Sequence, residues 1–347
     1  MLTVKDAVAL VTGGAGFVGA NLVRKLLAGG ARRIHIIDNL LSAERSNVPD
    51  HPAVQFTEAS ITDDRMLNSL ADEYDFVFHL ATYHGNQSSI HDPLADHENN
   101  TLTTLKLYEA LKGRSRLKKV VYSSAGCSVA EKTFSDARAT EETDFVSLVQ
   151  DSPYSMSKIF GEFYSAYYFK QHGLPVVRAR FQNVYGPGEI LGAGQWRGTP
   201  ATVWRNVTPT FIYKALMKEP LPLENEGAAT RDFIYVEDVA EGLIACALRG
   251  RAGEAYNIAS GMETSIRELA ERINRLTGNP AGVALLPKRS WDHSGRRFGS
   301  TAKALRELRF EARTSLDDGL QATIQWTRRH LALIDQTIAK HASHLRA

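Results

Sequence analysis

Tyr154 and Lys158 are the two residues of this chain whose types and spacing most directly suggest chemistry. They stand four residues apart, so on a helix they share one face, one turn apart. A free tyrosine is protonated at neutral pH, but an ammonium about 4 Å away favours the phenolate by up to about 4 kcal/mol at an intermediate dielectric. A phenolate held in this way can take the proton of a hydroxyl group while a hydride leaves the same carbon.

A glycine motif at residues 12–19, TGGAGFVG, could hold the acceptor of that hydride. Gly13 permits a tight turn, Gly16 lets the backbone approach a pyrophosphate, and Gly19 lets a helix pack closely on a strand. The N-terminus of the following helix supplies free amide hydrogens and a partial positive charge. The motif therefore predicts a dinucleotide site.

The elements around the glycines have the order that such a site needs. The apolar run Ala7 to Val11 predicts a buried parallel strand, Phe17 to Ala28 shows helical spacing, and Arg33 to Asp38 predicts a second strand. Asp38 follows the motif by about twenty residues, where a carboxylate accepts hydrogen bonds from an adenosine ribose. Because it also repels a 2′-phosphate, Asp38 favours NAD over NADP.

Strand and helix patterns alternate further along the chain. The strand-like runs are 54–57, 75–80, 119–123 and 174–180, and the helical ones are 64–72, 99–112 and 154–171. This alternation predicts an α/β fold with a doubly wound parallel sheet of the Rossmann type. We expect residues 1–182 to form the NAD-binding domain. Residues 183–347 are expected to form mainly a substrate-binding α/β region, with some segments returning to the sheet.

The second half contains a long irregular stretch, 186–208, rich in Gly, Pro and Trp, which is typical of a loop that covers a substrate. Helical patterns follow at 209–217 and 266–277. The last residues, 330–347, predict a loose helix without a clear role.

Composition narrows the function classes. The 347 residues are 43% hydrophobic and 23% charged, with a formal net charge of +2, so neither nucleic acid nor a membrane surface is an expected partner. No run of eighteen apolar residues predicts a membrane span. Two cysteines, Cys127 and Cys246, form no disulfide framework or metal-ligand spacing, so we expect no metal and a cytoplasmic location.

Taken with its longer motifs, the chain resembles the extended short-chain dehydrogenase/reductases of the NAD-dependent nucleotide-sugar epimerase/dehydratase family. Besides the two motifs above, the resemblance rests on Asp38-Asn39-Leu40 and on segments 79–81 (HLA), 99–100 (NN), 183–187 (NVYGP) and 231–239 (RDFIYVEDV). Within this family the chain is most similar to UDP-sugar 4-epimerases, including those associated with bacterial surface polysaccharide synthesis.

The resemblance implies a role for each matching position. For the cofactor, it assigns Phe17 and Val18 to the pyrophosphate, Asn39 beside Asp38 to the ribose end, and Ser60 and Ile61 to adenine. It places Leu80, Ala81 and Thr82 along the cofactor channel. Asn99 or Asn100 would hold the backbone near that channel. For a UDP-sugar, it assigns Asn183, Asn206, Val207 and Arg231, with Arg289 or Arg297 as a second cation. His84 and Ser88 lie in a polar run expected to face the sugar.

The chain departs from the family pattern at Ala125. Family members usually carry Ser or Thr there, which bridges the substrate oxygen and the tyrosine. Ser124 is our preferred replacement, and Ser128 and Cys127 are alternatives. Residues 125–127 also lack the carboxylates that sugar 4,6-dehydratases and UDP-glucuronate decarboxylases use in this loop. Hydride chemistry without elimination remains, which is epimerisation at C4 through a 4-keto intermediate.

Two other functions stay open. A nucleotide-sugar reductase would use exchangeable NAD(P)H, and a dinucleotide-sensing protein would use the same fold without catalysis. The sugar itself is also open, from UDP-glucose and its uronic acid to N-acetylated and diacetamido uronic acids. The family further implies a homodimer built on the helices that carry Leu102, Leu105, Tyr108 and Leu111, and Phe160, Phe163, Tyr167 and Tyr168.

Overall fold

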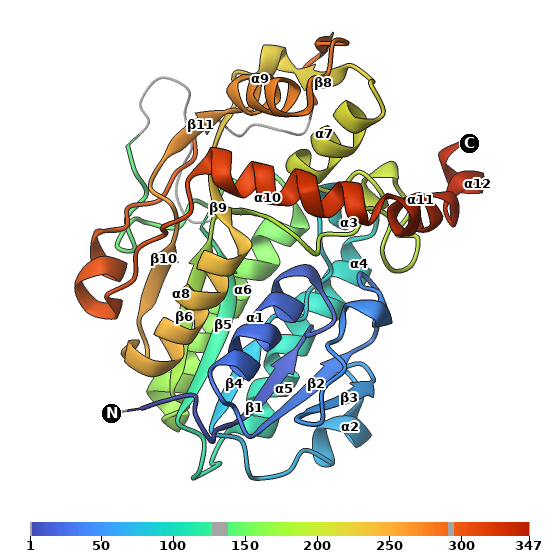
Figure 1. The fold of residues 1–347 in the computed structure, drawn as a ribbon. Coiled ribbons are helices and arrows are strands. Elements are labelled where there is room, and N and C mark those ends of the chain that lie inside the picture. Colours follow the sequence, from blue (N-terminus) through green and yellow to red (C-terminus); the bar gives the residue numbers. More distant parts are fainter. Residues whose placement is uncertain (1, 127–137, 291–294, 347) are drawn as a thin grey trace.

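A parallel sheet forms the centre of the larger part of the molecule (Figure 1). The computed structural model describes residues 2–126, 138–290 and 295–346. The sheet has seven strands in the order β10-β6-β5-β4-β1-β2-β3, and every neighbouring pair is parallel. The strands are β1 Val8–Thr12, β2 Arg33–Asp38, β3 Val54–Glu58, β4 Phe76–His79, β5 Lys119–Ala125, β6 Val176–Phe181 and β10 Ala255–Ile258. The α/β doubly wound fold is confirmed.

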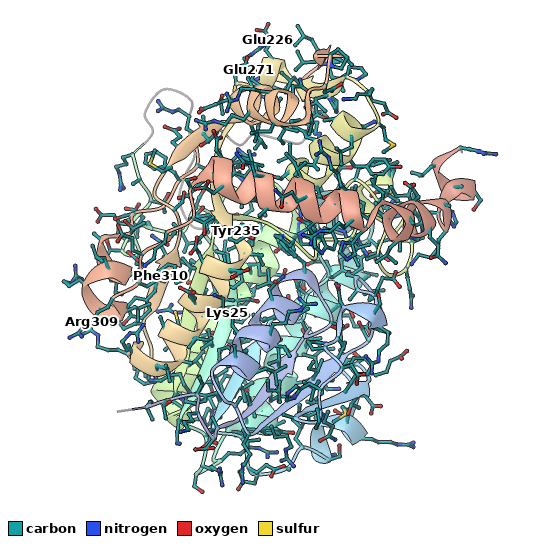
Figure 2. The ribbon with its side chains drawn as sticks, viewed as in Figure 1. Lys25, Glu226, Tyr235, Glu271, Arg309 and Phe310 are labelled. Carbon is teal, nitrogen blue, oxygen red and sulfur yellow. The ribbon has the colours of Figure 1, made fainter. Side chains whose placement is uncertain are left out.

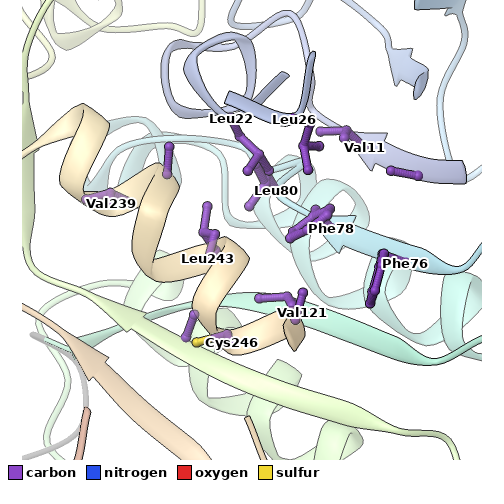
Figure 3. Packing of buried hydrophobic residues seen from close by; sticks show 14 of the residues in the cluster. Val11, Leu22, Leu26, Phe76, Phe78, Leu80, Val121, Val239, Leu243 and Cys246 are labelled. Carbon is purple, nitrogen blue, oxygen red and sulfur yellow. The ribbon is translucent and has the colours of Figure 1, made fainter. Parts of the chain in front are cut away.

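Helices cover the sheet on both faces. On one face α1, Phe17–Ala28, packs beside α8, Val236–Arg249, and Figure 3 shows Leu22 and Leu243 from these helices meeting sheet residues such as Phe78. The other face carries α2 Asp64–Asn68, α5 Thr103–Leu111 and α6 Pro153–His172. Lys25 on α1, labelled in Figure 2, forms ion pairs with Glu237 and Glu241 on α8 at 3.3 and 2.7 Å.

Short helices connect β4 to α5 and fill one end of the site. They are α3 Asn86–His91, α4 Pro93–Asp96 and a π-helical turn His97–Leu102. The π turn widens the helix at Asn99 and Asn100, and such turns are frequent at functional sites.

The smaller region lies over the carboxyl end of the sheet. It contains a three-stranded sheet, β7 Asn183–Tyr185, β9 Thr230–Tyr235 and β11 Glu263–Ser265, and a parallel pair, β8 Leu221–Glu224 and β12 Val283–Leu286. Helices α7 Val207–Leu216, α9 Ile266–Thr277 and α10 Leu316–Arg329 enclose its apolar core. Within this half of the chain, β10 returns to the large sheet and pairs with β6.

Two sequence expectations need correction, and one helix was not expected. Helix α2 ends at Asn68 rather than near residue 72, because the Ser69 hydroxyl donates to the Met66 carbonyl and closes the last turn. Strand β5 runs two residues past Ser123 to Ala125. Helix α10 was not predicted from the sequence.

The C-terminal residues are helical, as expected, but the expectation that they are loose is wrong. Helix α11, Leu331–Ala339, and the short α12, Ala342–Leu345, follow α10 and pack against the 186–206 segment. The Thr337 hydroxyl donates to the Leu191 carbonyl at 2.7 Å, and His341 Nε2 lies 2.9 Å from the Gly192 carbonyl. A Cβ on residue 192 would lie 2.6 Å from the Thr337 carbonyl oxygen. Because residue 192 is glycine, the two segments can approach each other through their backbones.

Gly19 provides a test of the packing between β1 and α1. A Cβ on Gly19 would lie 2.2 Å from the Gly13 carbonyl oxygen, and because that atom is backbone, no side-chain rotation relieves the contact. We expect Gly19→Ala to lower the midpoint of thermal unfolding and to weaken NAD binding. Gly16→Ala, whose Cβ would lie 3.2 Å from the same oxygen, is the control and should destabilise the cofactor-free protein less. Equal melting of both variants would contradict this account.

Candidate active site

A cavity of about 690 Å³ lies at the carboxyl ends of the strands, between the large sheet and the smaller region. This is where open α/β sheets bind ligands. Of the predicted site residues, it brings together Gly13, Gly16, Phe17, Val18, Gly19, Asp38, Asn39, Ser60, Ile61, Leu80, Ala81, Thr82, His84, Asn99, Ser124, Tyr154, Lys158, Asn183, Asn206, Val207, Arg231 and Arg297. Ser88 is not part of its wall and is fully buried beside it.

The glycine turn fits a dinucleotide. Gly13 has φ +74°, and a Cβ there would lie 2.6 Å from the Ala81 amide nitrogen, so the turn approaches the segment after β4 as only glycine allows. Gly16 occupies the N-cap of α1 and has no side chain to bind the first amides of the helix. Those amides and the helix dipole suit a pyrophosphate.

Asp38 lies where a ribose carboxylate is needed. Its side chain is buried in the cavity wall and accepts hydrogen bonds from the Ala15 and Leu40 amides at 3.0 and 2.9 Å. Burial raises the pKa of Asp38, and the backbone hydrogen bonds oppose that rise. The carboxylate thus connects the glycine turn to the end of β2.

Tyr154 and Lys158 stand on the first turns of α6, facing the same cavity. Ser152 caps the helix by accepting a hydrogen bond from the Ser155 amide, and Pro153 occupies the first turn, so the helix begins directly before Tyr154. Lys158 Nζ lies 5.7 Å from the centre of the Tyr154 ring and donates to the Ser123 carbonyl at 3.0 Å. The ammonium is therefore anchored to the end of β5.

Lys158 is almost fully buried, and burial lowers its pKa to about 8. The nearby Asp96 carboxylate opposes that effect. No carboxylate in the described ranges comes within ion-pair distance of Lys158, so its positive charge at neutral pH is available to an anion such as a phenolate.

The hydroxyl of Ser124 is engaged on α6. It donates to Glu162 Oε1 at 2.5 Å, and Glu162 in turn receives two hydrogen bonds from the Arg180 guanidinium, at 2.8 and 2.7 Å. All three side chains are buried. Ala125 lines the cavity and offers no donor, and the two alternatives, Cys127 and Ser128, lie outside the described residues.

Asn100, rather than Asn99, holds the chain after β4. Its carbonyl oxygen accepts from the Tyr83 amide and the Thr82 hydroxyl, and its Nδ2 donates to Asp96 at 2.7 Å. Asn99 lines the cavity, while its own amide donates to the Ala95 carbonyl.

The substrate side of the cavity carries cations and amides from the smaller region. Arg297 forms an ion pair with Asp151 at 2.5 Å, and Arg289 pairs with Glu224. Arg231 donates to the Thr230 carbonyl at 2.7 Å, and its neighbour Asp232 accepts from Ser260. The three guanidinium groups can bind a diphosphate if they exchange their present hydrogen-bond and ion-pair partners for its oxygens.

Sequence reasoning missed two residues of the cavity wall, the buried Glu189 and the partly buried Arg205. Glu189 is bonded to Asn206 Nδ2, its second carboxylate oxygen has no partner among the described residues, and burial raises its pKa to about 7. Arg205 donates to the carbonyls of Ser42 and Ala193 at 3.0 and 2.8 Å. Glu189 and Arg205 belong to the irregular 186–208 stretch, which has no periodicity to mark inward positions. Glu162, by contrast, follows Lys158 by one helical turn and could have been found from that spacing.

The buried network around Glu162 makes a stability prediction. Glu162→Gln leaves the Arg180 guanidinium without its carboxylate, so we expect the free energy of unfolding to fall by about 3 kcal/mol. Ser124→Ala removes one hydrogen bond and should cost about 1 kcal/mol. Chemical denaturation measures both free energies of unfolding. Glu241→Gln, which removes an exposed ion pair, is the control and should change the free energy of unfolding by less than about 1 kcal/mol. A Glu162→Gln variant as stable as the Glu241→Gln control would refute the argument.

Two histidines, the buried His79 and the partly buried His84, predict acid sensitivity. Burial lowers the pKa of His79 and of His84 to about 3, from 6.5 in an unfolded chain. Between these values the unfolded chain binds protons that the folded protein does not, so stability falls as the pH falls from 6.5 towards 3. His84→Gln should make this fall shallower in urea titrations at several pH values. The exposed His51→Gln is the control, and an unchanged slope for His84→Gln would contradict the prediction.

Comparison with known proteins gives the family. The profile of the NAD dependent epimerase/dehydratase family matches residues 9–259. A crystal structure of the Bordetella bronchiseptica enzyme WbmF in complex with NAD+ and UDP is 68% identical, covers 98% of both chains and superimposes with a TM-score of 0.90. The UDP-glucose 4-epimerase of Mycolicibacterium smegmatis is 30% identical over 327 residues, 92% of this chain and 98% of that protein.

Relatives also differ in the reactions that their names describe. A trifunctional UDP-glucose 4,6-dehydratase/UDP-4-keto-6-deoxy-D-glucose 3,5-epimerase/UDP-4-keto-L-rhamnose-reductase of Arabidopsis thaliana is 26% identical over 331 residues. Those residues are 93% of this chain, which spans about half (47%) of that protein. In the described ranges no helix is both long and apolar enough to cross a membrane.

The family match explains why the glycine turn, Asp38 and the Tyr154–Lys158 pair lie in one cavity. The chain belongs to the NAD-dependent epimerase/dehydratase family, and NAD is its cofactor.

Proposed function

We propose that this enzyme interconverts the C4 epimers of a UDP-sugar through a 4-keto intermediate. One observation carries the proposal most directly. The cavity wall beside Tyr154 and Lys158 continues through Ala125, and residues 125–127 contain no carboxylate that could promote elimination. Tyr154 and Lys158 support removal of the proton of a hydroxyl group and of a hydride from the carbon that carries it. This reaction needs no further acid in the 125–127 loop.

The residues of the chain divide the work as follows. Tyr154 takes the proton of the sugar hydroxyl and later returns it, while Lys158 stabilises the phenolate and donates towards the cofactor ribose. Asp38 and the amides at the start of α1 hold the adenosine ribose and the pyrophosphate. The chemistry that NAD supplies when bound is reversible acceptance of a hydride at its nicotinamide ring.

The nucleotide of the substrate is assigned to the smaller region. Asn183, Asn206 and Val207, with Arg231 and Arg297, line the part of the cavity expected to bind UDP. The WbmF structure, at 68% identity, contains UDP, which supports a uridine nucleotide as the ligand of this cavity. In the proposed role, the enzyme acts in the cytoplasm and supplies a precursor for a surface polysaccharide.

The proposal includes a homodimer. On α6, Phe160, Phe163 and Tyr167 are 44%, 56% and 54% exposed, which supports an apolar contact between copies of this helix. The other aromatic and aliphatic side chains expected at that interface divide differently, because Tyr108, Leu111 and Tyr168 are buried against the sheet.

Glu189 favours a second candidate, dehydration. It is a buried carboxyl in the cavity wall with a pKa raised to about 7, so it could exchange a proton with a substrate at neutral pH. The two reactions differ in their products: epimerisation conserves the mass of the sugar, and dehydration loses water.

Tyr154→Phe tests the proposed reaction. With a panel of UDP-sugars monitored by NMR, the wild type should produce the C4-inverted sugar. The rate of the variant should be about 10²–10⁴-fold lower, because general acid–base catalysis is removed. NAD should remain bound in the variant through gel filtration. Tyr164→Phe, on the same helix but outside the cavity wall, is the matched control and should keep its activity.

The same measurements separate the other functions. Product that has lost water would favour dehydration, and a cofactor that dissociates and is consumed as NAD(P)H would favour a reductase. Unchanged turnover of Tyr154→Phe would remove the mechanism. Bound NAD without turnover of any UDP-sugar would favour a sensor.

A further inference from the structure

The sugar oxygen at the reacting carbon needs a hydrogen-bond donor besides Tyr154. This oxygen changes between a hydroxyl and a carbonyl, and it carries partial negative charge during the transfer. Tyr154 must be deprotonated to begin the reaction, so it accepts from this oxygen rather than donating to it. A second group that keeps its own proton would hold the oxygen in both directions.

The end of β5 does not readily supply that donor. The Ser124 hydroxyl donates to Glu162 at 2.5 Å, and releasing it would leave a buried carboxylate with one hydrogen bond fewer. Ala125 has a methyl group in the cavity wall. Ser123 also lines the cavity, so its hydroxyl is one alternative to be tested, beside Cys127 and Ser128, which lie outside the described residues.

His84 lies against Tyr154 in the cavity wall. The two ring centres are 6.1 Å apart, and their planes meet at 61° in an edge-on contact. His84 lines the same cavity as Tyr154 and Lys158. Its ring is therefore within reach of a small group that also touches the Tyr154 hydroxyl.

The backbone around His84 is held on both sides. Asn100 accepts from the Tyr83 amide at 2.7 Å and donates to the Tyr83 carbonyl at 3.2 Å. Beyond His84, Asn86 accepts from the Ser152 hydroxyl at 3.1 Å, and Ser89 accepts from the Tyr154 amide at the same distance. The segment is thus bonded to the first turn of α6, which fixes His84 relative to Tyr154.

The charge state of His84 suits a donor that does not titrate. Burial, with the cations Arg205, Arg197 and Lys158 nearby, lowers its pKa to about 3, so the ring is neutral at physiological pH. Its Nδ1 is buried and has no hydrogen-bond partner in the part of the chain that the structure describes. With no acceptor at Nδ1, the single proton of the ring is better placed on Nε2. A neutral imidazole can polarise a carbonyl without giving up its proton.

We propose that His84 is a catalytic residue whose imidazole N–H donates a hydrogen bond to the sugar oxygen at the carbon where Tyr154 removes the proton. This inference rests on the proposed 4-epimerase function and adds a role to it. His84 keeps its proton throughout, and the only proton that it helps to move is the one exchanged between the sugar oxygen and Tyr154. In this role His84 does the work of a hydroxyl that residue 125 does not provide.

Two substitutions at His84 test the proposal. His84→Leu removes the donor, and kcat for interconversion should fall about 10²–10³-fold, the cost of losing one donor to a developing oxyanion. His84→Gln carries an N–H group near the position of Nε2 and should lose less than about tenfold. His84→Met replaces His84→Leu if the latter does not fold.

Binding measurements separate a catalytic role from a structural one. NAD content after gel filtration and the Kd of UDP by calorimetry should match the wild type in both variants, and KM should change only a few-fold. Ser123→Ala tests the alternative donor, since it removes a hydroxyl of the cavity wall near Lys158, and its loss of kcat should be smaller than that of His84→Leu. A loss in Ser123→Ala larger than in His84→Leu would overturn the proposal.

The remaining outcomes are also distinct. Normal kcat in His84→Leu would overturn the role of His84 and leave the 4-epimerase function intact. Equal losses in His84→Leu and His84→Gln, with lowered NAD content, would show a structural role instead. A wild type that inverts no UDP-sugar at C4 would overturn the proposed function, and this inference with it.

Discussion

The hydrogen bond from Lys158 Nζ to the Ser123 carbonyl is the contact around which the site is arranged. It joins α6 to the end of β5 at 3.0 Å, in a position where both are buried. The Tyr122 hydroxyl donates back to the Lys158 carbonyl at 3.3 Å, so strand and helix are tied in both directions. Gly161 makes this approach possible, because a Cβ there would overlap the Tyr122 ring.

The two buried charges on α6 are stabilised in different ways. Glu162 is matched by Arg180 and Ser124, and these partners hold its pKa below the ordinary value despite burial. Lys158 has a carbonyl oxygen and a more distant Asp96, and its pKa is lowered. A fully paired charge is structural, whereas an incompletely paired one can still respond to a ligand. One turn of helix therefore separates a structural charge from a functional one.

Closure of the cavity depends on contacts between distant segments. Arg197 donates to the Ser42 hydroxyl at 3.1 Å, and Arg205 donates to the Ser42 carbonyl, so the 186–206 segment is fixed to the chain that follows Asp38. This segment also packs on α11, and its Trp196 stacks on His344 of α12 with ring centres 4.7 Å apart. The C-terminal helices thus support one wall of the cofactor and substrate cavity, although they contribute no residue to it.

The sequence by itself determined the local elements and the residues whose roles follow from backbone geometry. Helices α1 and α9 and strand β2 have the predicted bounds, because apolar periodicity, glycines and caps are local signals. Gly13, Asp38, Tyr154 and Lys158 converge on one cavity, since parallel strands bring their carboxyl ends to one edge.

Only the tertiary structure decided which polar side chains remain available in that cavity. Ser124 was preferred for its place in the sequence, yet its hydroxyl is bonded to Glu162, thirty-eight positions away. Glu189, Arg205 and the docking of α11 lie in or against an irregular segment, where no period marks the inward side. Hydrogen-bond partners so far apart along the chain are chosen by packing, which is a property of the whole fold and leaves no local pattern to read.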